Sequence, residues 1–488
     1  MSRRGLGDRE AEGGERAILY PTRAHKSIQS RGLVFERALN DPALDRSTWH
    51  THAQREPLGM NRPVSSRKSR DQLPRRRFAA SSPVLLALWL VSVPLTAAAE
   101  AQAADANAHV AQGRALLRAG KPKEAEALLK RAAAERGNST EALYDLARVH
   151  FATDNYNQAR NACRPLLAKA PENAFSNLCM AQAFLTWRRA TRAAEFVEKA
   201  RASAPDLPEV YQVLGDLKRI EGDASASEAA YRRVLSVRPN DPDAQFGLGQ
   251  VYLIKPDTTA AAKAFRAALD QAPDWPDALF QLGRLSTGPE AVQLLEKALA
   301  ARPNWPEARI ALGEAVLAQG ENQRAEQLFR DVLKHNPTLP LAHARLGMAL
   351  VARDELAQAE AELKRGLQGL PNDADAALAL ARVYARTDRP EDAFEAYRNA
   401  ASRERETSRA LVEAGSYALT LQRSTLAQGF LEKAVERTPS SAPAQARLAD
   451  ALLARGEKDQ AKQHYQLALR AQGQVDRVDI QRRLDALK

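Results

Sequence analysis

The chain has 488 residues, 44% of them hydrophobic and 27% charged, a composition typical of a soluble, folded protein rather than a disordered or membrane-embedded one. The formal net charge is +11, but residues 1–99 hold 17 Lys and Arg against 9 Asp and Glu, which leaves 54 against 51 for the remainder. An excess of +3 over the rest of the chain does not predict a nucleic-acid partner.

The first segment, residues 1 to about 80, is a basic leader that we expect to be disordered. Met60 offers an alternative start, because it is followed by a basic stretch that ends in Arg75-Arg76-Arg77, as a signal peptide begins. Residues 1–59 would then be an over-extended start. The rival interpretation, an organelle transit peptide, is disfavoured by the acidic residues Asp8, Glu10 and Glu12.

Residues 81–103 have the pattern of the apolar and cleavage regions of a secretory signal peptide. An apolar run from Pro83 to Leu95 precedes small-residue sites that predict cleavage after Ala99 or Ala103. The run is shorter than the roughly 20 residues of a membrane span. We therefore expect a periplasmic or exported protein. An uncleaved inner-membrane anchor is the alternative, and twin-arginine export is a weaker one.

A proline recurs every 34 residues over most of the chain, with one step of 30 and one of 68, as shown by Pro171, Pro205, Pro239, Pro273, Pro303, Pro337, Pro371 and Pro439. A fixed period in this range indicates a solenoid of repeated units. The residues of each repeat can be numbered so that this proline occupies place thirty-two. Place eight then always holds a small residue, as in Gly215 and Gly249, and place twenty holds Ala or Ser. Place twenty-four is large, as in Tyr231 and Phe265. Two helices should therefore cross closely in each unit, with large residues filling the gap that small ones leave.

These features resemble the tetratricopeptide repeat, whose signature includes Leu-Gly on the first helix, Ala and an aromatic residue on the second, and a closing proline. The resemblance covers eleven units, roughly residues 106–475. It implies an all-α, right-handed superhelical solenoid over residues 104–475, with a concave groove. The tryptophan that is common at place four is absent.

Two departures from regularity predict local features. The unit that begins at Pro276 lacks four residues, so its hairpin should be short and should bend the superhelix, with Pro289 opening its second helix. Residues 476–488 place Ile480, Leu484 and Leu487 at helical spacing, which predicts a C-terminal capping helix.

The resemblance implies that the first helix of each unit lines the groove, chiefly through places two, five, nine and twelve. The strongest groove combination is Phe246, Gln250, Phe280 and Arg284, because aromatic, amide and guanidinium groups together can hold a peptide. We expect these residues to lie outside the packing between the two helices of each hairpin. The full predicted partner-binding set is Tyr144, Arg148, Gln182, Phe246, Gln250, Phe280 and Arg284.

Catalytic chemistry is not indicated. The eight histidines are scattered, and the sequence contains no metalloprotease, nucleophile-elbow or phosphate-loop motif. No catalytic residue, metal site or cofactor is therefore predicted. Cys163 and Cys179 are favoured as two small buried residues, and the alternative is a disulfide formed after export.

Together these features predict a non-enzymatic scaffold of the bacterial cell envelope that binds a protein or peptide partner in its groove. Outer-membrane assembly, pilus formation and exopolysaccharide export are all compatible with it. The alternative is an accessory subunit of a polysaccharide synthesis or modification complex that contacts glycan directly. Peripheral membrane association also stays open, and an enzyme would require clustered acidic residues in the groove.

Overall fold

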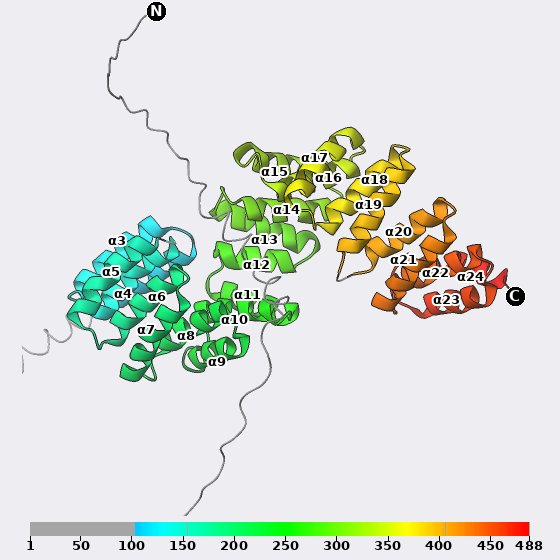
Figure 1. Ribbon diagram of the computed structural model, residues 1–488. Helices are drawn as coiled ribbons and strands as arrows, with labels where there is room; N and C mark the ends of the chain where they lie inside the picture. Colours follow the sequence, from blue (N-terminus) through cyan, green and yellow to red (C-terminus); the bar gives the residue numbers. More distant parts are fainter. Residues whose placement is uncertain (1–102, 154, 406, 488) are drawn as a thin grey trace, which may run out of the picture. The chain divides into compact units, whose positions relative to one another are not determined.

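Helices follow one another in antiparallel pairs through the described residues of the computed structural model, 103–153, 155–405 and 407–487 (Figure 1). All of these residues belong to one unit of the chain, Ser82–Lys488. The predicted leader, the cleavage sites and the signal-peptide segment up to residue 102 lie outside the described residues. No helix in the described part is both long enough and apolar enough to cross a membrane.

The described residues form eleven helix pairs and one final helix, each pair corresponding to one predicted unit. The first helices of the pairs are 103–118, α4 Thr140–Ala152, α6 Ala174–Thr186, α8 Pro208–Glu221, α10 Pro242–Ile254, α12 Pro276–Leu285, α14 Pro306–Ala318, α16 Pro340–Ala352, α18 Ala374–Arg386, α20 Arg409–Thr420 and α22 Ala442–Ala454. The second helices are α3 Pro122–Glu135, α5 Tyr156–Lys169, α7 Ala190–Ser203, α9 Ala224–Val237, α11 Thr258–Gln271, α13 Gly288–Ala301, α15 Asn322–His335, α17 Leu356–Gly369, α19 Pro390–Arg403, α21 Ser424–Arg437 and α23 Lys458–Arg470, and the chain closes with α24 Arg477–Asp485.

Local sequence sets the ends of these helices. Asp223, Asp241 and Asp257 accept hydrogen bonds from backbone N–H groups in the first turns of α9, α10 and α11. Such caps satisfy donors that a helix start leaves unpaired. Several first helices carry proline in their first turn, where the missing N–H has no intrahelical partner to lose.

The close crossing predicted within each pair is confirmed. A Cβ added to Gly215 would lie 2.6 Å from the ring of Tyr231, and one added to Gly249 would lie 2.5 Å from the ring of Phe265. Both rings are fully buried, so only glycine leaves room for them. The same relation, place eight against place twenty-four, holds for Gly113 and Leu129, Gly313 and Phe329, Gly347 and Leu363, and Gly415 and Leu431.

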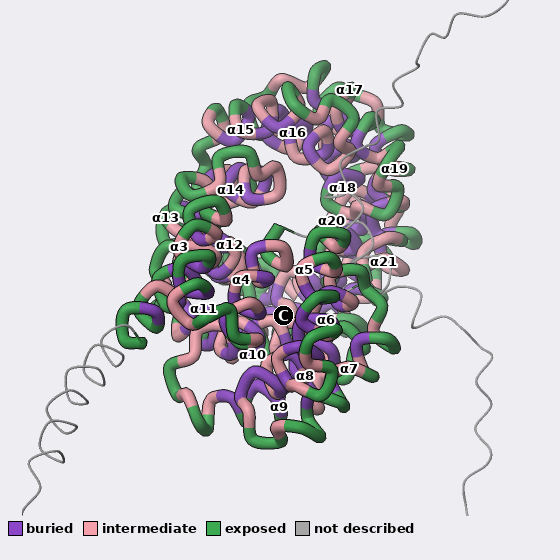
Figure 2. The backbone as a smooth tube through the Cα atoms, turned by 90° about the vertical axis from the view of Figure 1, so that its left-hand side faces the viewer, coloured by how far each residue is buried: buried purple, intermediate pink, exposed green. Residues whose placement is uncertain are grey.

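The hydrophobic core runs along the array instead of gathering at one centre. One cluster of buried residues extends from Val292 to Ala444, across successive pairs. Buried residues lie on the sides of helices that face other helices, and exposed residues are concentrated at the turns and on the outer surfaces (Figure 2). Each unit therefore depends on its neighbours for burial.

The predicted short unit is short in its first helix. α12 has 10 residues, whereas α10 and α14 have 13 each. α13 begins at Gly288, and Pro289 lies in its first turn, close to the predicted position. The four missing residues therefore come out of the end of the first helix and the turn after it.

Candidate functional site

Many neighbouring first helices contact one another directly. Contacts join α4 to α6, α6 to α8, α8 to α10, α14 to α16, α16 to α18, and α20 to α22. The term first-helix face denotes places two, five, six, nine and twelve of these helices. It contains all seven of the residues predicted to bind a partner.

The predicted residues of the second unit are largely occupied by internal contacts. Tyr144 is only 1% exposed and packs against Phe175 with the ring centroids 5.7 Å apart. Burial raises the pKa of the Tyr144 hydroxyl well above its usual value. Tyr144 therefore contributes more to packing than to an open binding surface. Gln182 in the third unit is half-buried.

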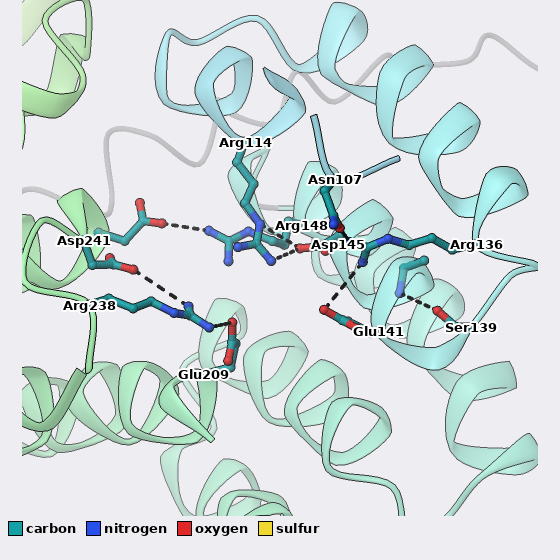
Figure 3. A network of polar contacts seen from close by, with 12 residues as sticks. Asn107, Arg114, Arg136, Ser139, Glu141, Asp145, Arg148, Glu209, Arg238 and Asp241 are labelled. Atoms are coloured by element: carbon teal, nitrogen blue, oxygen red, sulfur yellow. Dashed lines mark hydrogen bonds and ion pairs between the residues drawn. The ribbon is translucent and has the colours of Figure 1, made fainter. Parts of the chain in front are cut away.

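Arg148 takes part in an ion-pair network that connects distant units. Its guanidinium lies 3.1 Å from a carboxylate oxygen of Asp243 in α10, and Arg118 donates two hydrogen bonds of 2.9 Å to the same carboxylate. Nearby, Arg114 donates to Asp145, which is 1% exposed. Figure 3 shows Arg114 and Arg148 extending toward the same region beside Asp145. Asp243 thus links the first and second units to the fifth.

The electrostatics of Asp243 follow from its partners. Burial alone would raise the pKa of its carboxyl group, but hydrogen bonds from Arg118 and the charges of Arg118 and Arg148 outweigh burial and hold this pKa well below its usual range. Burial also opposes the charge of Arg148, and the Asp243 carboxylate more than compensates, so the pKa of Arg148 is raised. The pair is ionised at neutral pH and is held within the fold.

Three of the charged residues at place nine are paired with a charged residue at place six of the next unit. Three pairs share this relation, each 31 residues apart: Arg114 with Asp145, Glu314 with Arg345, and Arg382 with Glu413. Two other acidic residues at place nine accept hydrogen bonds from buried tyrosines, Asp216 from Tyr231 at 2.7 Å and Asp450 from Tyr465 at 2.6 Å. Much of the charge on the first-helix face therefore holds adjacent helices in register.

The predicted strip in the fifth and sixth units is more accessible, and tryptophans support it. Phe246 and Phe280 are half-buried and Arg284 is exposed. Phe246 packs 4.5 Å from the ring of Trp275, and Phe280 packs 4.6 Å from that of Trp305. The Arg284 guanidinium lies 5.6 Å from the Phe280 ring. Gln250 is half-buried on the same helix as Phe246.

One expectation about this strip needs correction. Phe246 also packs against Phe265 in the second helix of its own hairpin, with centroids 5.5 Å apart. It therefore does not lie outside the packing within the hairpin. Phe280 and Arg284 remain the better candidates for contact with a partner.

Several residues that hold the first-helix face in place were not predicted from the sequence. Trp275 and Trp305 are the last residues of their units. Arg118 lies at the end of its helix, outside places two, five, nine and twelve, so the repeat pattern does not indicate it. Asp243 occupies place two, a groove position, but its pairing with residues of much earlier units has no signal in the sequence. In the described residues, no three metal-ligating side chains converge on one site.

Family models described as tetratricopeptide repeat match five ranges of the chain, two of which overlap. One matches residues 116–183, 288–347 and 316–373, and another matches residues 213–276 and 412–476. Together these cover more than half of the chain. No curated protein matches the sequence.

Solved structures with a similar fold include yeast Tom70, with 14% identity and a TM-score of 0.42 over 78% of this chain and 95% of that one. The human IFIT1 dimer with m7Gppp-AAAA has 16% identity and a TM-score of 0.41, over 68% of this chain and 90% of that one. A thermophilic tetratricopeptide-repeat protein of Thermus thermophilus has 21% identity and a TM-score of 0.31, over 37% of this chain and 98% of that one.

Proposed function

Because the chain belongs to the tetratricopeptide-repeat family, we propose that it is a non-enzymatic scaffold that holds a protein partner against its first-helix face in the bacterial cell envelope. The observation that carries this proposal is the series of eleven helix pairs in the described residues, in which many neighbouring first helices contact one another. Such a series offers a long surface of fixed geometry, which suits recognition of an extended partner.

The fifth and sixth units are the proposed contact region. There, Phe280 and Arg284 combine an aromatic ring with an exposed guanidinium, and Trp305 holds the ring in place. Aromatic and arginine side chains that are already positioned lose little freedom on binding. In the second unit, by contrast, Arg148 is engaged by Asp243 and Tyr144 is buried.

The envelope location is supported by a disulfide. Cys163 in α5 and Cys179 in α6 are bonded to each other, and both are fully buried. The sequence favours two buried cysteines that are not bonded to each other, whereas the structure contains the disulfide. Disulfides persist mainly in oxidising compartments such as the periplasm, which agrees with the signal-peptide pattern before residue 104.

Site-specific photo-crosslinking in cells tests the scaffold proposal. A photo-reactive amino acid replaces exposed Arg284 on the first-helix face, and a control replaces Leu467, which is 46% exposed on a second helix. We expect a discrete protein adduct from position 284 and none from position 467. Equal adducts at both positions, or none at position 284, would contradict binding at this face. A protease-resistant, glycan-containing adduct would favour the polysaccharide alternative.

A further inference from the structure

The edge of the array where first helices end and second helices begin carries a repeated ion pair. Glu228 pairs with Lys255 of the next unit, and Glu326 pairs with Arg353 in the same relation. Glu360 pairs with Arg389 of the next unit at 3.0 Å. In each case a glutamate at place twenty-one neutralises a cation that the following unit contributes.

This pattern is reversed between the second and third units. Place twenty-one there is Arg160, and the residue that corresponds to Arg389 is Arg189. Arg160 lies 5.5 Å from the ring of Tyr156, Tyr156 stacks on Trp187 at 4.4 Å, and Arg189 lies 4.4 Å from the Trp187 ring. Arg160 is thus a cation at the place where Glu228, Glu326 and Glu360 carry a carboxylate, and the rings of Tyr156 and Trp187 lie between Arg160 and Arg189.

The rings and cations continue along α7. Phe184 stacks on Phe196 at 5.6 Å, and the ammonium of Lys199 lies 5.5 Å from the Phe196 ring. Trp187 is 42% exposed, the most exposed large aromatic side chain in the described residues. We call Tyr156, Arg160, Phe184, Trp187, Arg189 and Lys199 the α5–α7 edge.

The cations of the α5–α7 edge lack carboxylate partners within the described residues. The span 156–203 contains more Lys and Arg than Glu, and two of its glutamates, Glu195 and Glu198, pair with Arg192 and Arg201. The buried Nε of Arg160 has no hydrogen-bond partner. Positive charge without a matching carboxylate is thus concentrated on this surface.

We propose that the α5–α7 edge is a second interaction surface, which binds an acidic polypeptide segment whose carboxylates alternate with apolar side chains. A guanidinium beside an aromatic ring keeps N–H groups that can donate two parallel hydrogen bonds to a carboxylate. Contact with the rings restrains the Arg160 and Arg189 side chains before binding, which lowers the entropy that binding costs. The disulfide joins α5 to α6 and so connects the helix that carries Arg160 to the one that ends beside Trp187.

A polypeptide fits this edge better than a purely charged polymer. Phe196 lies beside Lys199, and half-buried Phe184 stacks on Phe196, so apolar area is available next to the positive charge. A chain with alternating acidic and apolar side chains would use both. This inference rests on the proposed function as a protein scaffold, but it concerns a surface outside the first-helix face.

The structure provides a substitution that removes the site while keeping the fold. Arg160→Glu restores the carboxylate found at Glu228, Glu326 and Glu360, and should pair with Arg189 as Glu360 pairs with Arg389. Arg398→Glu is the control, because it makes the same change of charge at an exposed position in α19. Circular dichroism melts of all three proteins verify folding.

Fluorescence polarisation with labelled peptides of repeating Glu-Glu-Leu or Gln-Gln-Leu tests the proposal. The unmodified protein should bind the acidic peptide more tightly than its glutamine counterpart. Arg160→Glu should weaken that binding by at least about tenfold, and Arg398→Glu should not. Equal binding of the two peptides, or equal loss in both variants, would overturn the proposal. If polygalacturonate or oligodeoxythymidine binds at this edge and the acidic peptide does not, the assignment to a polypeptide partner is wrong.

Failure of this inference can be distinguished from failure of the proposed function. Photo-crosslinking from position 284 is repeated in the Arg160→Glu background. If peptide binding fails but the adduct persists, only the edge proposal is lost. If no adduct forms in either background while the peptide binds, the scaffold surface lies at the edge instead of at the first-helix face.

Discussion

At the scale of single residues, the glycines at place eight show how one missing methyl group sets helix packing. The added Cβ at Gly249 would overlap the ring of Phe265, which is fully buried and cannot move into solvent. Gly429 in α21 offers a contrast, because nothing lies within 4 Å of the Cβ it would gain. Both glycines lie inside helices of the array, but they differ in what surrounds them.

The variants Gly249→Ala and Gly429→Ala should therefore have opposite effects on stability. Alanine favours a helix interior by about 1 kcal/mol over glycine, and overpacking costs about 1–3 kcal/mol. The net effect of Gly249→Ala should be to lower the free energy of unfolding by up to about 2 kcal/mol, and Gly429→Ala should raise it by up to about 1 kcal/mol. Urea denaturation measures both. A stabilised Gly249→Ala protein would show that the ring of Phe265 has room to shift.

Asp243 provides a second prediction at this scale. Its carboxylate holds Arg118 and Arg148, and the side chains of all three are largely buried. Asp243→Asn should lower the free energy of unfolding at pH 7 by roughly 1–3 kcal/mol, because it leaves two buried cations without an ionic partner. Asp206→Asn is the control, since Asp206 is exposed in its pair with Arg233 and its loss should cost less than about 1 kcal/mol.

The pH dependence of this effect has a definite sign. The pKa of Asp243 is lowered in the folded state, so its stabilisation is present above the unfolded pKa, near 4, and is lost as the pH falls toward the folded pKa. The difference in free energy of unfolding between the original protein and Asp243→Asn should be constant from about pH 5 to 8 and should become smaller below about pH 4. A difference that widens in acid would contradict the ionic account.

At the scale of elements, the end of the array needs a covering helix, and α24 lies there. Ile480 and Leu484 are buried and join the cluster that contains Leu448 and Tyr465. Arg483 donates to Asp450 in α22 at 2.9 Å. The element therefore covers the apolar flank of the last pair and connects to it through a charged hydrogen bond.

Removal of residues 476–488 should lower the melting temperature and promote self-association, because the flank of α22 and α23 would be exposed. Leu484→Ala should lower the free energy of unfolding by about 2–5 kcal/mol. Arg482→Ala, on the exposed side of α24, should have little effect. Scanning calorimetry and light scattering measure these outcomes. A monomeric truncation that melts unchanged would refute a capping role.

At the scale of the whole molecule, compartment and disulfide should be linked. N-terminal sequencing of the mature protein should give residue 100 or 104 as the first residue, after cleavage at Ala99 or Ala103. The same sample, denatured without reductant, should resist thiol alkylation at Cys163 and Cys179 and become reactive after reduction. Retention of residues 60–99 would indicate a membrane anchor, and free thiols in the native protein would argue against an oxidising compartment.

Partner binding is the other prediction at this scale. Phe280→Ala should reduce the photo-adduct formed at position 284 by at least about tenfold, since the ring forms the apolar part of the proposed contact. Lys297→Ala, on the second helix of the same pair, is the control. Unchanged adduct yield in a folded Phe280→Ala protein would move the binding site to another part of the chain.

The helix pairs, their number in the described residues, the shortness of the sixth unit and the small-to-large contact within each pair could all be predicted from the sequence. These follow from local periodicity, because helix formation and the crossing of adjacent helices depend on residues within about one repeat of each other. Gly215 against Tyr231 is such a contact. Candidate positions on the first-helix face could be named for the same reason.

Which of these positions are engaged in contacts with other units could not be predicted, because it depends on how the hairpins are placed against one another. The pairing of Arg118 and Arg148 with Asp243 depends on the angles between hairpins, which add up over several units and leave no mark in any single repeat. The disulfide between α5 and α6 and the stack of Tyr156 on Trp187 likewise depend on how one unit is placed against the next. The repeat encodes each hairpin separately, whereas these contacts are made between hairpins, where small differences in geometry determine whether two side chains meet.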